Sequence, residues 1–134
     1  MSALTKDRNT VRKQGEYAAY PVKGGTKIYA GSIVAMGPDG NAVPGSDTAG
    51  LKFLGISREY VDNTAGADGD LTVTVWRRGC FELSASGMAK ANVGDAVYVV
   101  DDQTIGLTAI NNISCGKISD FNSAASVYVD IEKA

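Results

Sequence analysis

Apolar and polar residues alternate with a period of two along most of the chain, which is the spacing of a β-strand rather than of a helix. The clearest example is residues 71–77, where Leu71, Val73 and Val75 alternate with threonine and tryptophan. β-Branched residues dominate this segment, and glycine, asparagine and aspartate mark the gaps between such segments. The pattern predicts short strands joined by turns.

The predicted strands share this alternation or a continuous apolar run, and they cover residues 16–22, 27–36, 41–43, 51–61, 71–77, 80–84, 96–100, 104–109, 113–120 and 126–132. Pro21 restricts the first strand to a sheet edge or a strand end, and Gly55 predicts a bulge or bend. The best helix candidate is the short segment 86–92. About eight to ten short strands at this spacing predict an all-β fold, a small barrel or a sandwich.

Two parts of the chain differ in pattern. Residues 1–15 are polar and have no periodicity, so they are predicted to form an extended N-terminal arm, and residues 16–134 are predicted to form a single all-β domain. The predicted core consists of apolar strand residues: Ile28, Ile33, Val34, Phe53, Leu54, Val73, Val75, Val97, Val99, Ile118, Val127 and Val129.

Composition bounds the functional classes. The chain has 134 residues, of which 44% are apolar, and this is the size of one ordinary domain. No apolar run approaches the roughly 18 residues of a membrane-spanning helix. The 16 glycines and only 3 prolines fit many tight turns. The absence of histidine from the sequence removes the commonest general base and metal ligand. We therefore expect no enzymatic activity, no catalytic or metal-binding residues and no cofactor.

Cysteines and aspartates offer little chemistry. The opening MSALTKDRNTVRKQ lacks the apolar stretch of a secretory signal, so we expect cytosolic folding without a disulfide. Cys80 and Cys115 are predicted to be small buried hydrophobes. The aspartates of residues 62–70 do not follow a calcium-loop pattern, so this segment is predicted to be a solvated hairpin loop. Asp101 and Asp102 are predicted to lie in a turn at a strand end.

Charge is unevenly distributed. Residues 1–27 hold six cations and two anions, whereas the rest of the chain holds seven cations and thirteen anions. A basic arm on an acidic body is typical of contact with an acidic surface, either a nucleic acid or a protein. The alternative is a solvated chain terminus.

The sequence Trp76–Arg77–Arg78 places an aromatic residue beside two cations. Such a group is typical of a hot spot for a protein partner or of a stacking platform for single-stranded nucleic acid. The third interpretation is a core tryptophan followed by solvated arginines. The acidic charge of the whole chain disfavours nucleic acid, because phosphate contacts dominate that affinity.

Several short segments along nearly the whole chain carry a resemblance through their order, although none of them is diagnostic alone. They are residues 3–10 (ALTKDRNT), 20–22 (YPV), 30–34 (AGSIV), 59–63 (EYVDN), 65–69 (AGADG), 75–79 (VWRRG) leading to Phe81, 93–98 (VGDAVY) and 99–102 (VVDD). In this order they resemble the capsid decoration, or cement, proteins of tailed bacteriophages.

The resemblance implies a structural virion protein on the outer surface of the phage head. Such a protein is made in the bacterial host cytoplasm, bridges neighbouring major capsid subunits and stabilises the shell against internal DNA pressure. The implied partners are the major capsid protein and further copies of the chain, more often in a homotrimer than in a dimer, with no nucleic acid and no membrane. An alternative is a virion tail or fibre module that recognises a host-surface ligand, and a small β-fold enzyme is a third.

Candidate capsid-binding residues combine apolar anchors with cations of the arm and of the tryptophan segment. They are Leu4, Lys6, Arg8, Val11, Arg12, Lys13, Tyr17, Tyr20, Trp76, Arg77 and Arg78.

Overall fold

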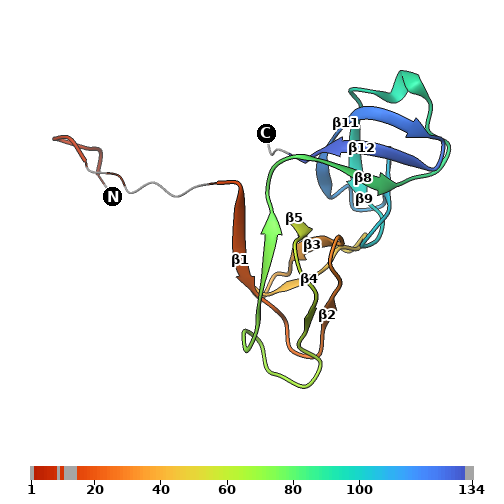
Figure 1. Ribbon diagram of the computed structural model, residues 1–134. Coiled ribbons are helices and arrows are strands. Elements are labelled where there is room, and N and C mark those ends of the chain that lie inside the picture. Colours follow the sequence, from red (N-terminus) through yellow and green to blue (C-terminus); the bar gives the residue numbers. More distant parts are fainter. Residues whose placement is uncertain (1, 9, 11–14, 132–134) are drawn as a thin grey trace.

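The computed structural model describes residues 2–8, 10 and 15–131 (Figure 1). These residues form twelve β-strands and one short 3-10 turn, Lys90–Asn92. The prediction of an all-β protein is therefore confirmed. The helix candidate at 86–92 is reduced to this one turn, in which no residue is buried, so no apolar face stabilises a longer helix.

The first sheet has five antiparallel strands from the N-terminal half of the chain. Their order is β1 (Tyr17–Pro21), β7 (Thr72–Trp76), β5 (Lys52–Ser57), β3 (Ile33–Met36) and β4 (Ala42–Pro44). As predicted from Pro21, β1 is an edge strand and ends at this proline. A separate two-stranded sheet pairs β2 (Lys27–Ile28) with β6 (Val61–Asp62).

The second sheet comes from the C-terminal half. Its antiparallel order is β10 (Ile105–Gly106), β9 (Ala96–Val99), β11 (Ser114–Ser123), β12 (Ser126–Asp130) and β8 (Cys80–Ser84). In Figure 1 it lies at the upper right, whereas β1 stands at the opposite side of the molecule. Within the described part of the chain none of the three sheets closes into a barrel.

Two clusters of buried side chains form the interior. The large core contains Ile33, Phe53, Ile56, Leu83, Met88, Val97, Val99, Ile105, Ile113, Cys115, Ile118, Val127, Val129 and Ile131. The small core contains Val22, Ile28, Val34, Ala42, Val61, Val73 and Val75. Ile33 and Val34 are adjacent in β3 but belong to different cores, because successive side chains of a strand point to opposite faces. The first sheet therefore supplies both cores.

Leu54 is the exception among the predicted core residues: all the others are buried, whereas its side chain is half-buried against the small core. The reason is the predicted bulge at Gly55. Val34 pairs with Gly55 and the next residue of β3 pairs with Phe53, so Leu54 is the extra residue. A Cβ atom at Gly55 would collide with the carbonyl oxygen of Trp76 on β7, so glycine permits the close approach of these strands.

Two predicted strands are each divided in the structure, which raises the count above the predicted eight to ten. Residues 27–36 form β2 and β3, separated by a turn at Gly31, whose φ is 80°. Residues 51–61 form β5 and the start of β6. Glycine adopts this positive φ without the clash that a Cβ would cause, so it ends one strand and allows the chain to enter a different sheet.

The two cysteines have different environments. Cys115 is buried in the large core, and burial raises the pKa of its thiol to about 12. The prediction of burial is wrong for Cys80, which is exposed. Leu83 of β8 is buried and Cys80 is not, because residues three apart in a strand point to opposite faces.

Candidate functional site

An aromatic pair is formed by the exposed Tyr17 at the start of β1 and the half-buried Trp76 at the end of β7. Tyr17 and Trp76 are directly opposite each other in the register of these strands. Their ring centroids are 5.9 Å apart and the rings are inclined at 84°, which is the edge-to-face arrangement that aromatic quadrupoles favour. Trp76 also pairs with Ile56 of the large core. The same face of the first sheet is therefore buried at β5 and open at β1.

Arg58 completes this cluster, although it is absent from the predicted site. Its guanidinium carbon lies 4.6 Å from the Tyr17 ring centroid and 4.5 Å from that of Trp76, so it makes cation–π contacts with both. Its backbone N–H donates to the carbonyl of Thr74 at 2.9 Å. In the sequence Arg58 is only a cation near the end of a predicted strand. The sequence does not show that β7, which carries Trp76, lies beside it.

The chain around Arg58 is held by short-range hydrogen bonds. The buried Ser57 hydroxyl donates to the carbonyl of Glu59 at 2.6 Å. The Glu59 carboxylate accepts from the backbone N–H of Thr74 at 2.9 Å. Arg58, Glu59 and Thr74 line a shallow hollow of about 260 Å³. These contacts fix the direction in which the chain leaves β5.

The two arginines after Trp76 lie at the start of β1. The Arg77 backbone N–H donates to the carbonyl of Glu16 at 2.8 Å. The Arg78 guanidinium lies against Gly15, with Nη2 3.1 Å from the position that a Cβ would take there. Both arginine side chains are exposed. The structure thus brings Trp76, Arg77 and Arg78 to the point where the N-terminal segment joins the domain.

The other predicted site residues are not part of this cluster. Tyr20 points to the opposite face of β1 and is half-buried against the small core. Leu4 is 72% exposed, and Lys6 and Arg8 are also exposed. In Figure 1 the described residues before position 11 lie away from both sheets. Three predicted residues lie outside the described part of the chain: Val11, Arg12 and Lys13.

We define the root surface as Tyr17, Arg58, Trp76, Arg77 and Arg78. It contains three arginines, all of them exposed. Within the described part of the chain the one salt bridge joins Lys23 to Asp39, with 2.7 Å between Nζ and Oδ2. That ammonium lowers the pKa of Asp39 to about 2. The three guanidinium groups of the root surface thus form no salt bridge with any described residue.

The aspartates of the loop after β6 have structural partners. The Asp62 carboxylate accepts from the Thr64 hydroxyl at 2.6 Å and from the Thr64 N–H at 3.0 Å, and these bonds lower its pKa. Asp68 accepts from the N–H of Gly24, and Asp70 accepts from that of Ala67. Among the described residues no group of three or more cysteine, aspartate and glutamate side chains is placed to hold a metal ion.

The turn predicted at Asp101 is confirmed. The Asp101 carboxylate accepts from the backbone N–H groups of Gln103 at 2.9 Å and Thr104 at 2.8 Å. These bonds lower its pKa, against the opposing effect of desolvation. The group therefore closes a turn between β9 and β10.

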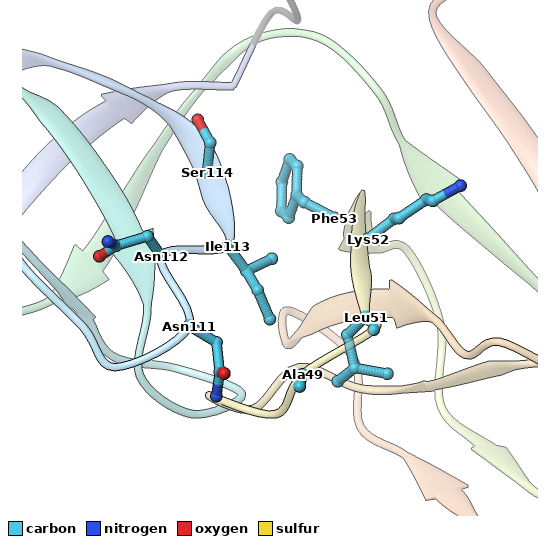
Figure 2. A pocket seen from close by; sticks show the side chains of 9 residues that line it. Ala49, Leu51, Lys52, Phe53, Asn111, Asn112, Ile113 and Ser114 are labelled. Atoms are coloured by element: carbon cyan, nitrogen blue, oxygen red, sulfur yellow. The ribbon is translucent and has the colours of Figure 1, made fainter.

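A second hollow, of about 430 Å³, lies between the two sheets and is lined by Ala49–Phe53 and Asn111–Ser114. Figure 2 shows Phe53 and Ile113 facing each other across it, while Lys52 points away. The two sides are joined by Asp47, whose carboxylate accepts from the N–H groups of Ile110 at 2.9 Å and Asn111 at 2.8 Å. These hydrogen bonds join the two sides of the hollow, so we interpret it as a gap between the packed sheets.

The combination of tyrosine, tryptophan and arginine at the root surface has the composition of a protein-interface hot spot. Residues 12–132 match the family of phage cement proteins, so the chain belongs to this family. No curated protein and no solved structure matches the chain. Membership in this family confirms a structural role associated with the virion capsid and binding to capsid proteins. In the described residues no helix is long and apolar enough to span a membrane.

Proposed function

We propose that this protein binds the outer surface of the phage head, bridges neighbouring major capsid subunits and stabilises the shell against internal DNA pressure. The observation that carries the proposal is the root surface, where the exposed Tyr17 and the half-buried Trp76 hold Arg58 and the exposed Arg77 and Arg78 follow in the chain. Tyrosine, tryptophan and arginine are enriched among the few residues that dominate binding energy in protein interfaces. Family membership supplies the partner, since cement proteins act on capsids.

The division into an arm of residues 1–15 and a domain of residues 16–134 is part of this proposal. Ordering ~14 residues on docking costs roughly 1–2 kcal/mol each in backbone entropy. Exposed salt bridges contribute only ~0–1 kcal/mol apiece, so the docked arm needs apolar contacts as well as charge. The proposed anchors are Leu4, Val11 and Tyr17, because Tyr20 packs against the small core. The cations Lys6, Arg8, Arg12 and Lys13 set register and association rate.

We further propose that the protein forms a homo-oligomer on the capsid, a trimer rather than a dimer. The strands β1 and β4 end the first sheet, and β10 and β8 end the second. The two ends of each sheet meet at a single bridge, Val22 with Ala42 and Ser84 with Thr104, so most of each edge strand has no strand partner on its outer side. Exposed edges invite further pairing, and a symmetric assembly covers them. A cryo-EM reconstruction of decorated heads tests this: density on a three-fold or quasi-three-fold axis supports it, and isolated copies away from any axis contradict it.

Incubation with expanded empty capsids tests the main proposal. The intact protein should bind in a fixed ratio to the capsid subunits and raise the melting temperature of the shell. Deletion of residues 2–15 should leave the free domain folded with nearly the same melting temperature and weaken capsid binding by about tenfold or more. Charge reversal at Arg8 and Arg12 should weaken binding less, and mainly at low salt.

A matched control makes the same change of charge at one cation of the 3-10 turn and one of β11. The double variant Lys90→Glu and Lys117→Glu reverses two exposed cations, and it should bind capsids as the intact protein does at moderate salt. A deletion variant that decorates capsids as tightly as the intact chain would show that the arm is a solvated terminus. Capsids that neither bind the intact protein nor gain stability from it would contradict the proposed function itself.

A further inference from the structure

Arg58 is an exposed arginine that the fold holds in one place. Its backbone is tied to β7 through Thr74, and its guanidinium contacts the Tyr17 and Trp76 rings at 4.6 and 4.5 Å. Because the rings are inclined at 84°, they form a corner that restricts the guanidinium from two directions. An arginine ordered in advance loses less side-chain entropy when a ligand binds.

The donors of this guanidinium have no acceptor in the described part of the chain. No hydrogen bond or salt bridge there uses them. The nearest carboxylate in sequence, that of Glu59, already accepts from the Thr74 N–H at 2.9 Å. Arg58 therefore offers a planar set of N–H groups to solvent, and the exposed Arg77 and Arg78 directly follow its partner Trp76 in the chain.

We propose that Arg58 binds a carboxylate of the protein surface on which the root surface docks, through paired N–H···O bonds. This inference rests on the proposed function, and it names the chemistry of the contact: an aspartate or glutamate side chain of the capsid. A planar guanidinium matches a carboxylate with two parallel hydrogen bonds. A lysine ammonium has the charge but lacks this geometry.

A carboxylate suits the site better than the phosphates of a nucleic acid. Binding to a polyanion gains its strength from many phosphate contacts at once. The chain beyond residue 27 carries seven cations against thirteen anions, so an extended polyanion that follows the body meets net repulsion. A single fixed arginine beside an aromatic pair is instead the composition of a protein interface.

The first test measures the affinity of Arg58 variants for expanded capsids. Arg58→Met and Arg58→Lys should both weaken binding by about tenfold or more, because lysine does not restore paired hydrogen bonds. Lys90→Met removes one exposed cation from the 3-10 turn and should leave affinity unchanged. The melting temperature and near-ultraviolet circular dichroism of each free variant report whether it is folded. Arg58 variants that are folded and bind with the original affinity would overturn the inference while the proposed function stands.

The second test needs no capsid. Trp76 is the single tryptophan of the chain, so its fluorescence reports on the corner that holds Arg58. Hexaglutamate should change this emission in the intact protein and not in Arg58→Met or Arg58→Lys. Hexathymidylate should neither change the emission nor compete with hexaglutamate. If the oligonucleotide competes more strongly, or if hexaglutamate acts equally on the variants, the carboxylate assignment is wrong. A response to hexaglutamate that depends on Arg58, in a protein that fails to bind capsids, would support the site and contradict the proposed function.

Discussion

The two five-stranded sheets differ in how far they are covered. In the second sheet Val97, Val127 and Val129 are fully buried in the large core. Tyr128, which lies between Val127 and Val129 in β12, is exposed. The first sheet has a core on each face, yet one of these faces is buried only near β3 and β5. At β1 the same face carries the exposed Tyr17 and the half-buried Trp76. The uncovered end of the first sheet is where the root surface lies.

This difference separates the two parts of the domain by role. The second sheet buries apolar surface on one side and contributes stability. The first sheet contributes to both cores and leaves one end uncovered, where we propose that the partner binds. Alternation of apolar and polar residues builds both sheets, but it does not determine which part of an apolar or aromatic face is covered.

The largest effect should come from Gly55 and Gly116, which play the same part in the two sheets. A Cβ at Gly55 would collide with the Trp76 carbonyl oxygen, and one at Gly116 with that of Asp130. Substitution of either by alanine should lower the free energy of unfolding by roughly 3 kcal/mol or more, because strand backbones must separate. Denaturant unfolding measures the loss.

The two variants should differ in a way that sharpens the comparison. Gly55→Ala should alter Trp76 fluorescence in the folded protein, whereas Gly116→Ala should not, because Gly116 lies in the second sheet. Gly87→Ala is the control: its φ is 68° and no atom lies within 4 Å of the added Cβ, so only the backbone cost of about 1–2 kcal/mol remains. A Gly55→Ala protein as stable as this control would contradict the prediction.

Core truncations should have a smaller effect, similar in the two cores. Val99→Ala in the large core and Val34→Ala in the small core should each cost about 1–3 kcal/mol through lost burial and the cavity that remains. Both residues are fully buried. Combining them should give an additive loss if the cores are independent. Strong coupling measured in the double variant would show that β3 transmits changes from one core to the other.

Loss of the Asp47 contact should act locally. Asp47→Ala removes the acceptor for the N–H groups of Ile110 and Asn111, so hydrogen exchange at these two amides should become faster while the β11 and β12 amides keep their protection. The same bonds lower the pKa of Asp47. The folded state therefore gains from this carboxylate above its ordinary pKa and loses that gain as the pH falls below it. Equal protection factors at both amides in Asp47→Ala and in the intact protein, compared at the same pH, would contradict this account.

The smallest effect on stability should come from loss of the exposed ion pair between Lys23 and Asp39. The pKa of Asp39 is about 2, held down first by its hydrogen bond to Lys23, so the ion pair favours the folded state above pH ~4 and this contribution disappears as the pH falls through 2. In a carboxyl NMR titration Lys23→Met should raise the midpoint toward the ordinary value. Lys90→Met should leave it unchanged. A midpoint that does not move in Lys23→Met would show that the N–H of Asn41 alone holds the carboxylate.

Much of the fold could be predicted because its signals are local. Valines at alternate positions, as at Val73 and Val75, predict a half-buried strand whatever its neighbours are. Pro21 predicted an edge or a strand end because proline lacks the N–H that an inner strand donates. The division of residues 27–36 into β2 and β3 at Gly31 was not predicted. A glycine in an apolar run fits both a bulge within one strand and a turn into another sheet.

The candidate site was predicted only in part for a related reason. Tyr17, Trp76, Arg77 and Arg78 were identified from their chemistry, and β1–β7 pairing brings them together. Arg58 was not predicted because its place in the site depends on contacts with two rings that are distant in the sequence. Tyr17 lies 41 positions before it and Trp76 lies 18 positions after it. Tyr20 was given the same part as Tyr17, but an odd spacing places it on the other face of β1.

The sequence alone determined the all-β class, the buried valines and isoleucines, the basic N-terminal segment and the resemblance to cement proteins. These follow from periodicity, charge and residue order, which need no knowledge of what lies nearby in space. Only the tertiary structure decided that β3 and β5 of the first sheet contribute to both cores, that Cys80 is exposed, and that Arg58 contacts two aromatic rings. Strand pairing joins residues far apart in the chain, and its register decides which side chains share a face.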